Sequence, residues 1–164
     1  MSIKVLTPDE AINLIEDGDT LVVGGCASVC EPDQLLAALE ARFVETGHPK
    51  GLTEIHPTMV GDRVGRGISI FSHPGMLKRI VGGSYVSQRA PEVRRMILDN
   101  EIEAYNLPMG ALYFVLRAIG SGSPGYLTEV GIGTFVDPRQ GGGKLNTCTT
   151  EDLVSLVEIA GKEY

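Results

Sequence analysis

The hydrophobic pattern between residues 17 and 47 predicts a buried strand, a tight turn and a helix in immediate succession. Leu21–Val23 is a short apolar run bounded by turn-forming residues, which is typical of a central parallel strand buried on both faces. Gly24 and Gly25 follow this run, and Pro32 then opens a helix with apolar residues at helical spacing: Leu35, Leu36, Leu39 and Phe43. Such an order places free N–H groups at the carboxyl end of a sheet, where α/β proteins bind anions and polarise carbonyl groups.

The rest of the chain continues the alternation of strands and helices. The capping-box residues Thr7 and Glu10 predict a helix of about nine residues that Gly18 ends. The pattern predicts further strands at residues 52–59, 84–87, 103–105 and 153–159, and further helices at 91–100 and from Pro74 and Pro108 onward. This alternation favours one α/β domain with a mainly parallel open sheet and helices on both faces.

The last two predicted elements carry specific expectations. The helix from Pro108 has an apolar stripe that periodicity alone assigns to the core: Met109, Leu112, Tyr113 and Leu116. Ala160-Gly161 is typical of a hairpin turn, and Lys162–Tyr164 begins a return strand that has no room to finish. The domain, residues 1–164, is therefore expected to be truncated at its C-terminus.

One loop and one histidine leave alternatives open. Gly61–Gly67 is typical of an exposed mobile loop. As a lid it would bring Arg63 or Arg66 to a phosphate or carboxylate, and otherwise it is a solvated connection. His73 is expected to precede the helix that starts at Pro74, and no carboxylate in that segment supports a role as a catalytic base. We predict a structural role for it and for the other two histidines.

Composition excludes several classes of protein. The net charge is −7 and the 14 Lys and Arg residues are scattered, which argues against a nucleic-acid partner. No apolar segment is long enough to span a bilayer and no leader pattern is present, so we expect no membrane partner and a cytoplasmic location. The cysteines Cys26, Cys30 and Cys148 are expected to be reduced, and they do not complete a zinc site. A reactive thiol beside the helix start is the alternative to small residues packed in a tight turn.

Five segments, taken in order, resemble the family I coenzyme A transferases. They are DGDTLVVGG (Asp17–Gly25), PGMLKRIVGG (Pro74–Gly83), EIEAYNLPMG (Glu101–Gly110), GYLTEVGIGTFVDPR (Gly125–Arg139) and GGGKLN (Gly141–Asn146). The similarity covers nearly the whole chain and is to the N-terminal, alpha-type half, as in propionate/acetate CoA-transferases that carry both halves on one polypeptide. It implies a CoA-transferase fold, which is related to the ribose-phosphate isomerase type.

The resemblance also implies a reaction. In this family a Glu carboxylate attacks an acyl-CoA thioester, and CoA then passes through an enzyme-bound intermediate to an acceptor acid. That Glu belongs to the second half, which is absent here, so the chain is expected to be inactive alone. The implied partners are acyl-CoA, a short-chain carboxylic acid, the second half or subunit, and further copies in a homo-oligomer. No cofactor is expected to be bound permanently, since CoA thioester is a substrate, and the implied context is short-chain fatty acid and ketone-body metabolism.

The implied substrate-binding residues lie at two strand-to-helix junctions, with no catalytic residue among them: Gly24, Gly25, Cys26 and Ala27 at the first, and Asn106, Met109 and Gly110 at the second. They would shape the acyl site and offer N–H donors to a carbonyl oxygen. The chain departs from the family where Cys26, Cys30 and Met109 replace the usual Phe, Gly and Gln.

Two other functions remain to be weighed. A non-catalytic relative that keeps the fold for binding or regulation is the main alternative. A phosphosugar isomerase is disfavoured, because no Lys, Asp and Glu acid–base set gathers around the glycine turn.

Overall fold

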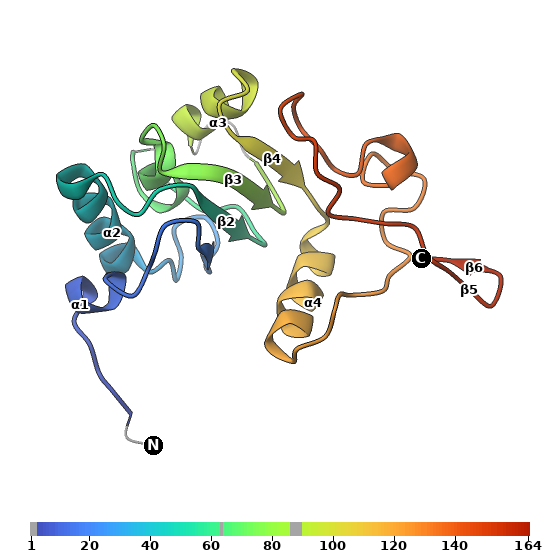
Figure 1. Cartoon of the computed structure of the whole chain (residues 1–164), viewed down its shortest axis with the longest axis horizontal. Helices are drawn as coiled ribbons and strands as arrows, with labels where there is room; N and C mark the ends of the chain where they lie inside the picture. The colour runs from blue at the N-terminus through green and yellow to red at the C-terminus, as the bar shows by residue number, and fades with distance from the viewer. Residues whose placement is uncertain (1–2, 63, 86–89) are drawn as a thin grey trace.

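The structure is a computed structural model that describes residues 3–62, 64–85 and 90–164 (Figure 1). Four strands form one parallel sheet in the order β1-β2-β3-β4. They are β1 (Thr20–Val22), β2 (Leu52–His56), β3 (Leu77–Gly82) and β4 (Glu103–Asn106). Because the strands run in one direction, their carboxyl ends meet at a single edge of the sheet. The predicted parallel α/β fold is therefore confirmed.

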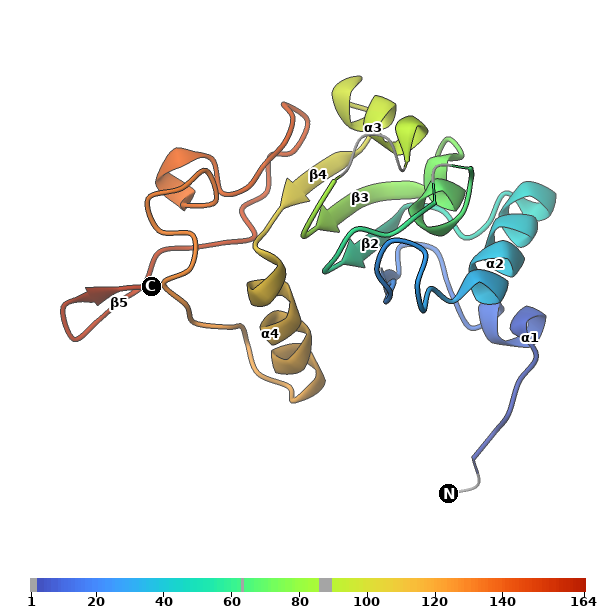
Figure 2. The ribbon, with the colours of Figure 1, turned by 180° about the vertical axis from the view of Figure 1, so that it is seen from behind.

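Most of the helices cover one face of this sheet (Figure 2). These are α1 (Pro8–Ile12), α2 (Asp33–Thr46), α3 (Pro91–Leu98) and the 3-10 helix η1 (Gly67–Ser72). Their buried side chains form one cluster with Ile80 and Ala104, which are fully buried in β3 and β4. The predicted core residues of α3 are all buried: Val93, Met96 and Ile97.

The remaining α-helix, α4 (Met109–Gly120), lies on the opposite face. Its buried residue, Leu112, packs with Val81 and Tyr105. Val81 follows Ile80 in β3 and therefore points to the other side of the sheet. Helices thus lie on both faces, as predicted. The helical spacing of α4 nevertheless misled the prediction about Met109 and Tyr113, whose exposed fractions are 50% and 53%, because α4 touches the sheet mainly through Leu112.

The chain after α4 is rich in turns and lies beyond β4 (Figure 1). Part of it returns along β4, where the Asn106 amide donates to the Gly143 carbonyl at 2.8 Å and the Leu145 amide donates to the Ala104 carbonyl at 2.9 Å. It contains η2 (Pro138–Gln140) and a hairpin of β5 (Glu158–Ile159) and β6 (Lys162–Glu163). Ala160 and Gly161 both have positive φ, 53° and 77°, as a two-residue hairpin turn requires. The hairpin was predicted correctly, but the strand predicted at 153–159 is confined to its last residues, since only these find an antiparallel partner.

Three other element predictions were wrong. The first strand is an edge strand of the described sheet, paired only with β2, so Val22 is 49% exposed where burial on both faces was expected. No helix starts at Pro74. The residues that follow it form β3, which pairs with β2 on one side and with β4 on the other. Ser84 and Tyr85 are not in a strand, and residues 86 and 87 of that prediction lie outside the described residues.

Two further boundaries moved. The first helix has the expected capping box at Thr7 but spans 5 residues. Pro57 ends β2, one of the places that its sequence position allowed. None of the helices in the described part of the chain is long and apolar enough to cross a bilayer.

Candidate functional site

Both predicted junctions lie at the carboxyl edge of the sheet. Gly24 follows β1 closely, and Leu107 follows β4 directly. Since β2 and β3 lie between these strands, and neighbouring strands are about 4.8 Å apart, the two strand ends are separated by roughly 14 Å. The junctions therefore flank the ends of β2 and β3 and do not meet at one point.

The first junction is a turn that folds back on itself. Cys26 and Val29 exchange two backbone hydrogen bonds of 2.9 Å, and the Ala27 amide donates to the Met59 carbonyl at 2.7 Å. The Cys26 and Ala27 amides are thus already used, contrary to the expectation that Cys26 offers a free donor. The amides of Gly24 and Gly25 make no hydrogen bond in the described part of the chain. They are the donors that this junction can offer.

Glu31 fixes this turn, and the sequence analysis missed it. Its Oε1 accepts hydrogen bonds from the Ser28 amide (2.7 Å) and the Gly61 amide (3.0 Å). Gly25 has φ of +122°, and a Cβ there would lie 2.5 Å from the Glu31 Cγ. The carboxylate therefore ties the first junction to the loop at 61–67, and glycine is required beside it. No local signal distinguishes Glu31 from an ordinary turn residue before a helix.

The second junction is joined to β3. The Gly82 carbonyl accepts hydrogen bonds from the Asn106 side-chain Nδ2 (2.9 Å) and from the Leu107 amide (3.0 Å). The Asn106 amide group is therefore a positioning contact and not a free donor. Met109 and Gly110 lie in the first turn of α4, where amides have no intrahelical acceptor and the helix dipole is positive.

Gly83 brings the end of β3 against this helix start. A Cβ on Gly83 would lie 1.9 Å from the Pro57 carbonyl oxygen and 3.2 Å from the Met109 Cα. Only glycine allows the ends of β2, β3 and α4 to approach this closely. The Met109 side chain is half exposed beside this contact.

A buried ionisable pair lies directly under these strand ends. Glu54 and His56 are fully buried on one face of β2, and the His56 Nδ1–H donates to the Glu54 Oε2 at 2.7 Å. Glu54 Oε1 and His56 Nε2 have no hydrogen-bond partner among the described residues. Burial is the largest influence on the pKa of His56 and lowers it. The charge and hydrogen bond of Glu54, with a smaller contribution from the Ser84 backbone, together outweigh burial and raise the pKa above 6.5.

Tyr85 completes this cluster. Its ring meets the His56 ring edge-on, with 5.1 Å between centroids, and its hydroxyl donates to the Tyr105 carbonyl at 2.9 Å. Burial, and after it the Glu54 charge, raise the pKa of Tyr85 well above 10.0, so the hydroxyl stays neutral. Sequence analysis gave His56 a structural role but did not anticipate its carboxylate partner.

The other two histidines also pair with carboxylates. His48 lies 2.9 Å from Asp17, and His73 lies 2.8 Å from Glu40, a residue of α2 that is distant in the sequence. The search within the His73 segment therefore missed its partner. Both pairs lie away from the strand ends and join elements together.

The loop at 61–67 does not present Arg66 as a free cation, which the interpretation as a lid required. Arg66 lies 3.6 Å from both Asp33 and Asp62, so its charge is already paired. Asp62 also accepts hydrogen bonds from the Val64 and Arg66 amides. The other candidate, Arg63, lies outside the described residues. Within the residues described, no three His, Cys, Asp or Glu side chains gather as metal ligands would.

Comparison with known proteins assigns the chain to a family. The model of the family described as "Coenzyme A transferase" matches residues 5–164, and the chain is a member of that family. It is a family I domain, similar to the alpha subunits of these enzymes and to the N-terminal part of the longer single-chain ones.

Curated relatives agree with this assignment. The chain is 43% identical to the acetate CoA-transferase YdiF of Escherichia coli (strain K12), over 99% of this chain and 30% of that protein. It is 37% identical to the caffeate CoA-transferase of Acetobacterium woodii, over 98% of this chain and 30% of that protein. The chain thus spans about a third of the length of these relatives.

A solved structure supports the fold. The acyl-CoA transferase YdiF apoenzyme from Escherichia coli O157:H7 superposes with a TM-score of 0.90 at 43% identity, over 98% of this chain and 31% of that chain. Glutaconate coenzyme A-transferase from Acidaminococcus fermentans shares the fold at 16% identity with a TM-score of 0.67.

Proposed function

We propose that this chain is the acyl-binding half of an acyl-CoA:carboxylate CoA-transferase, which moves CoA between carboxylic acids through an intermediate on a Glu outside this chain. The observation that carries the proposal is the shared sheet edge, where two junctions present amides with no other partner among the described residues. The donors are Gly24 and Gly25 on one side and Met109 and Gly110 on the other. In acyl-transfer enzymes, one such donor to a developing oxyanion contributes on the order of 3 kcal/mol.

Met109 and Cys26 set the character of the acyl site in this proposal. The family pattern has Gln where this chain has Met109, so a polar side-chain contact is replaced by a flexible apolar one while the backbone amide stays. Cys26 replaces Phe on the exposed turn and leaves more room for a bulky acid. The relatives include an acetate and a caffeate CoA-transferase, which indicates that acids of different size occur in this family.

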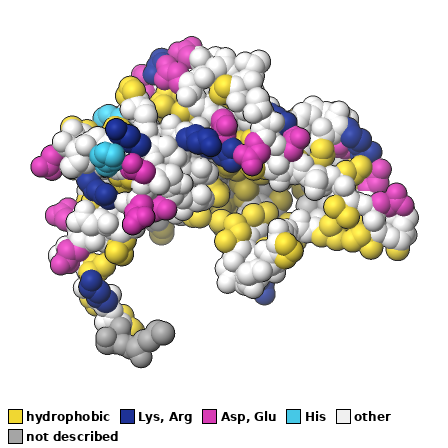
Figure 3. Space-filling model, in the orientation of Figure 1, with side chains coloured by type: hydrophobic (Ala, Val, Ile, Leu, Met, Phe, Trp, Pro, Cys, Tyr) yellow, Lys and Arg dark blue, Asp and Glu magenta, His cyan; other side chains and the backbone are white. Residues whose placement is uncertain are grey.

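The second half is proposed to cover the apolar face beside α4. A groove of about 700 Å³ runs between α4, the sheet face that carries Ile55 and Val81, and the C-terminal segment. Hydrophobic side chains gather on this side of the molecule (Figure 3), and Phe114, Ile119 and Phe135 are 50%, 61% and 51% exposed. A surface this apolar is typical of an interaction site. One relative, from Escherichia coli (strain K12), is the alpha subunit of an acetate CoA-transferase, which is consistent with such a partner.

The test uses the longer protein, or this chain combined with its second half. After exposure to acyl-CoA, intact-mass and peptide mass spectrometry should find CoA attached to a Glu outside residues 1–164, while the isolated chain gains no adduct. An adduct within the isolated chain contradicts the proposed division of labour. Absence of any adduct from the combined protein favours the non-catalytic binding or regulatory role. The cytoplasmic location and the homo-oligomer stay predictions.

A further inference from the structure

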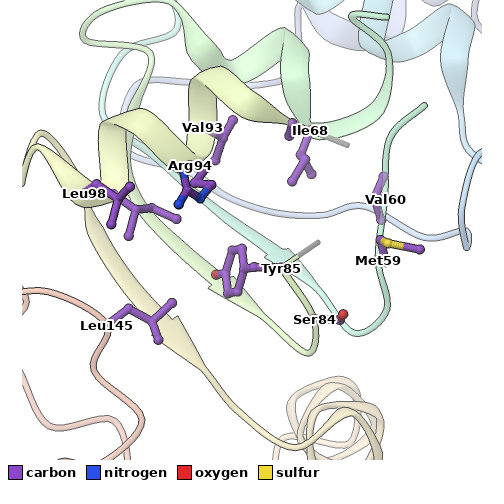
Figure 4. A pocket seen from close by; sticks show the side chains of 11 residues that line it. Met59, Val60, Ile68, Ser84, Tyr85, Val93, Arg94, Leu98 and Leu145 are labelled. Atoms are coloured by element: carbon purple, nitrogen blue, oxygen red, sulfur yellow. The ribbon is translucent and has the colours of Figure 1, made fainter. Parts of the chain in front are cut away.

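A cavity of about 230 Å³ lies between the end of β3 and helix α3 (Figure 4). The Tyr85 ring stands in its wall, Val93 and Leu98 line it from α3, and Met59 and Ser84 line the end that is nearest to the ends of β2 and β3. Most of its described surface is hydrocarbon. This cavity is separate from the groove along α4, because the two share no described lining residue.

The cavity adjoins both junctions of the candidate site. The Met59 carbonyl accepts the Ala27 amide, so one lining residue is bonded to the first junction. Ser84 follows Gly83, which lies against the Met109 Cα at the start of α4, so another lining residue adjoins the second junction. A group held by the free amides at the strand ends would therefore have the mouth of the cavity beside it.

The chemistry of the walls selects an apolar guest. The Tyr85 hydroxyl is already bonded to the Tyr105 carbonyl, so the ring presents carbon to the cavity. The described polar side chains in its lining are Ser84, next to the strand ends, and Arg94, which is exposed on α3 and makes no ion pair with any described residue. Arg94 could pair with an anion only at the outer surface of α3. A charged group deep among the apolar walls would have no partner among the described residues, which is unfavourable by several kcal/mol.

The size of the cavity sets the size of the guest. An apolar cavity of about 150 Å³ in another protein binds benzene, so this one accommodates about six to eight carbon atoms. Burying each methylene group contributes about 0.8 kcal/mol. A two-carbon acid such as acetate would leave most of the space unfilled and gain little from it.

We propose that this cavity holds the hydrocarbon tail of the acyl group, and that the chain takes acids with an apolar tail of about six to eight carbons in preference to acetate. The inference rests on the proposed function for the use of the tail in CoA transfer. The binding of an apolar tail in this cavity does not require that function, because the walls, which include Tyr85, Val93 and Leu98, are formed by this chain itself.

Binding of sodium octanoate and sodium acetate to the 164-residue chain, measured by calorimetry and by amide NMR shifts, tests the pocket directly. Leu98 is 59% exposed and lines the cavity at the end opposite Met59 and Ser84, so Leu98→Trp should fill that end while the chain still folds. We expect octanoate to bind more tightly than acetate, with shifts at Tyr85 and Val93, and Leu98→Trp to weaken octanoate about tenfold. The matched control is Val44→Trp on α2, which is 66% exposed, lies outside the cavity and should leave binding unchanged.

Each result decides the question. Octanoate that binds Leu98→Trp and the unaltered chain equally, or that shifts only residues along α4, overturns the pocket. So does a folded chain, checked by circular dichroism, that prefers acetate or binds neither acid. A second variant, Val93→Phe, reduces the volume from inside and should weaken octanoate in the same direction. Failure of CoA transfer by the longer protein would overturn the proposed function while this binding result still stands.

Discussion

Glu54 and His56 place a carboxyl group and an imidazole ring side by side in the interior of the fold. The two side chains are fully buried and hydrogen-bonded to each other, and one polar atom on each has no partner among the described residues. Such a pair adds little to stability compared with apolar residues, but removal of one member strands the other as a buried charge. The stability of the fold is therefore expected to be sensitive, at these two residues of β2, to both mutation and pH.

The raised pKa of His56 sets the direction of the pH effect. A group whose pKa is higher in the folded chain stabilises it below its unfolded pKa, here 6.5, and this contribution is lost as pH rises through the folded pKa. We expect the difference in unfolding free energy between the unaltered chain and the double variant Glu54→Leu/His56→Leu to fall as pH increases above 6.5. Urea unfolding followed by circular dichroism at a series of pH values measures it. A difference that rises over this range would contradict the raised pKa.

Glu54→Gln alone removes the charge that balances His56. At a pH below 6.5, where the ring is protonated, we expect this change to destabilise the chain by about 3 kcal/mol, since it leaves a buried imidazolium without a counter-charge. The double leucine variant should recover much of the loss. Equal stability of Glu54→Gln and the unaltered chain at that pH would show that the pair is not charged.

Gly83 is the other residue on which the site depends. A Cβ there would overlap the Pro57 carbonyl oxygen at 1.9 Å, and backbone atoms cannot move aside without displacing β2. We expect Gly83→Ala to cost about 1–3 kcal/mol by overpacking, measured as a lower midpoint of thermal unfolding. Gly120→Ala at the end of α4, where a Cβ meets nothing within 4 Å, is the control and should be neutral or stabilising.

At the scale of elements, α1 depends on a contact from another helix. It spans 5 residues, too few to be stable alone. The Arg42 guanidinium of α2 donates to the Ile12 carbonyl at the end of α1 and to the Ile15 carbonyl just beyond it, at 2.5 and 2.9 Å. A cation at this end also complements the helix dipole.

We therefore expect Arg42→Met to release α1 while the sheet stays intact. The loss of hydrogen bonds from a charged donor costs about 2 kcal/mol locally. Hydrogen exchange measured by mass spectrometry should rise in residues 8–16 and stay unchanged in β2 and β3. Arg117→Met is the matched control, because Arg117 is an exposed arginine in the last turn of α4, far from α1 in the sequence. Exchange that rises throughout the sheet would mean that Arg42 supports more than α1.

The same scale shows where sequence reasoning succeeds. The helix at 91–100 and the capping box at Thr7 were predicted correctly, because local spacing and hydrogen bonding determine them. The strand after Pro74 was missed, since its partners β2 and β4 come from other parts of the chain. The core position that periodicity alone gave Met109 was wrong for a related reason: periodicity describes a helix face but not what lies opposite it.

For the molecule as a whole, the apolar surface beside α4 is the feature with the largest consequences. Phe114 and Tyr126 stack with 4.9 Å between ring centroids, yet remain 50% and 38% exposed. We expect the isolated chain to self-associate through this surface, and Phe114→Ser/Tyr126→Ser to reduce self-association measured by sedimentation velocity over a range of concentrations. Val44→Ser on α2 should have no effect. Equal association of all three chains would contradict a role for this surface.

The candidate site could be predicted only in part from the sequence. The order of strands and glycine turns was enough to put both junctions at one edge of the sheet, as the structure has them. It gave no account of which amides are already bonded, so Cys26 and Asn106 were counted as donors although their N–H groups have partners. Those partners, Val29 and Gly82, are fixed by turn geometry and by strand pairing.

The carboxylate of Glu31 has a consequence for motion at this edge. Its Oε1 accepts hydrogen bonds from the amides of both Ser28 and Gly61, so two loops distant in the sequence are bonded to the same carboxylate oxygen. The Ser28 hydroxyl also donates to the Gly61 carbonyl at 3.0 Å, so neither loop can shift far without breaking a bond to the other. A ligand that binds at the first turn would therefore also alter the position of the second loop. A substitution that displaces either loop would disturb the other in the same way.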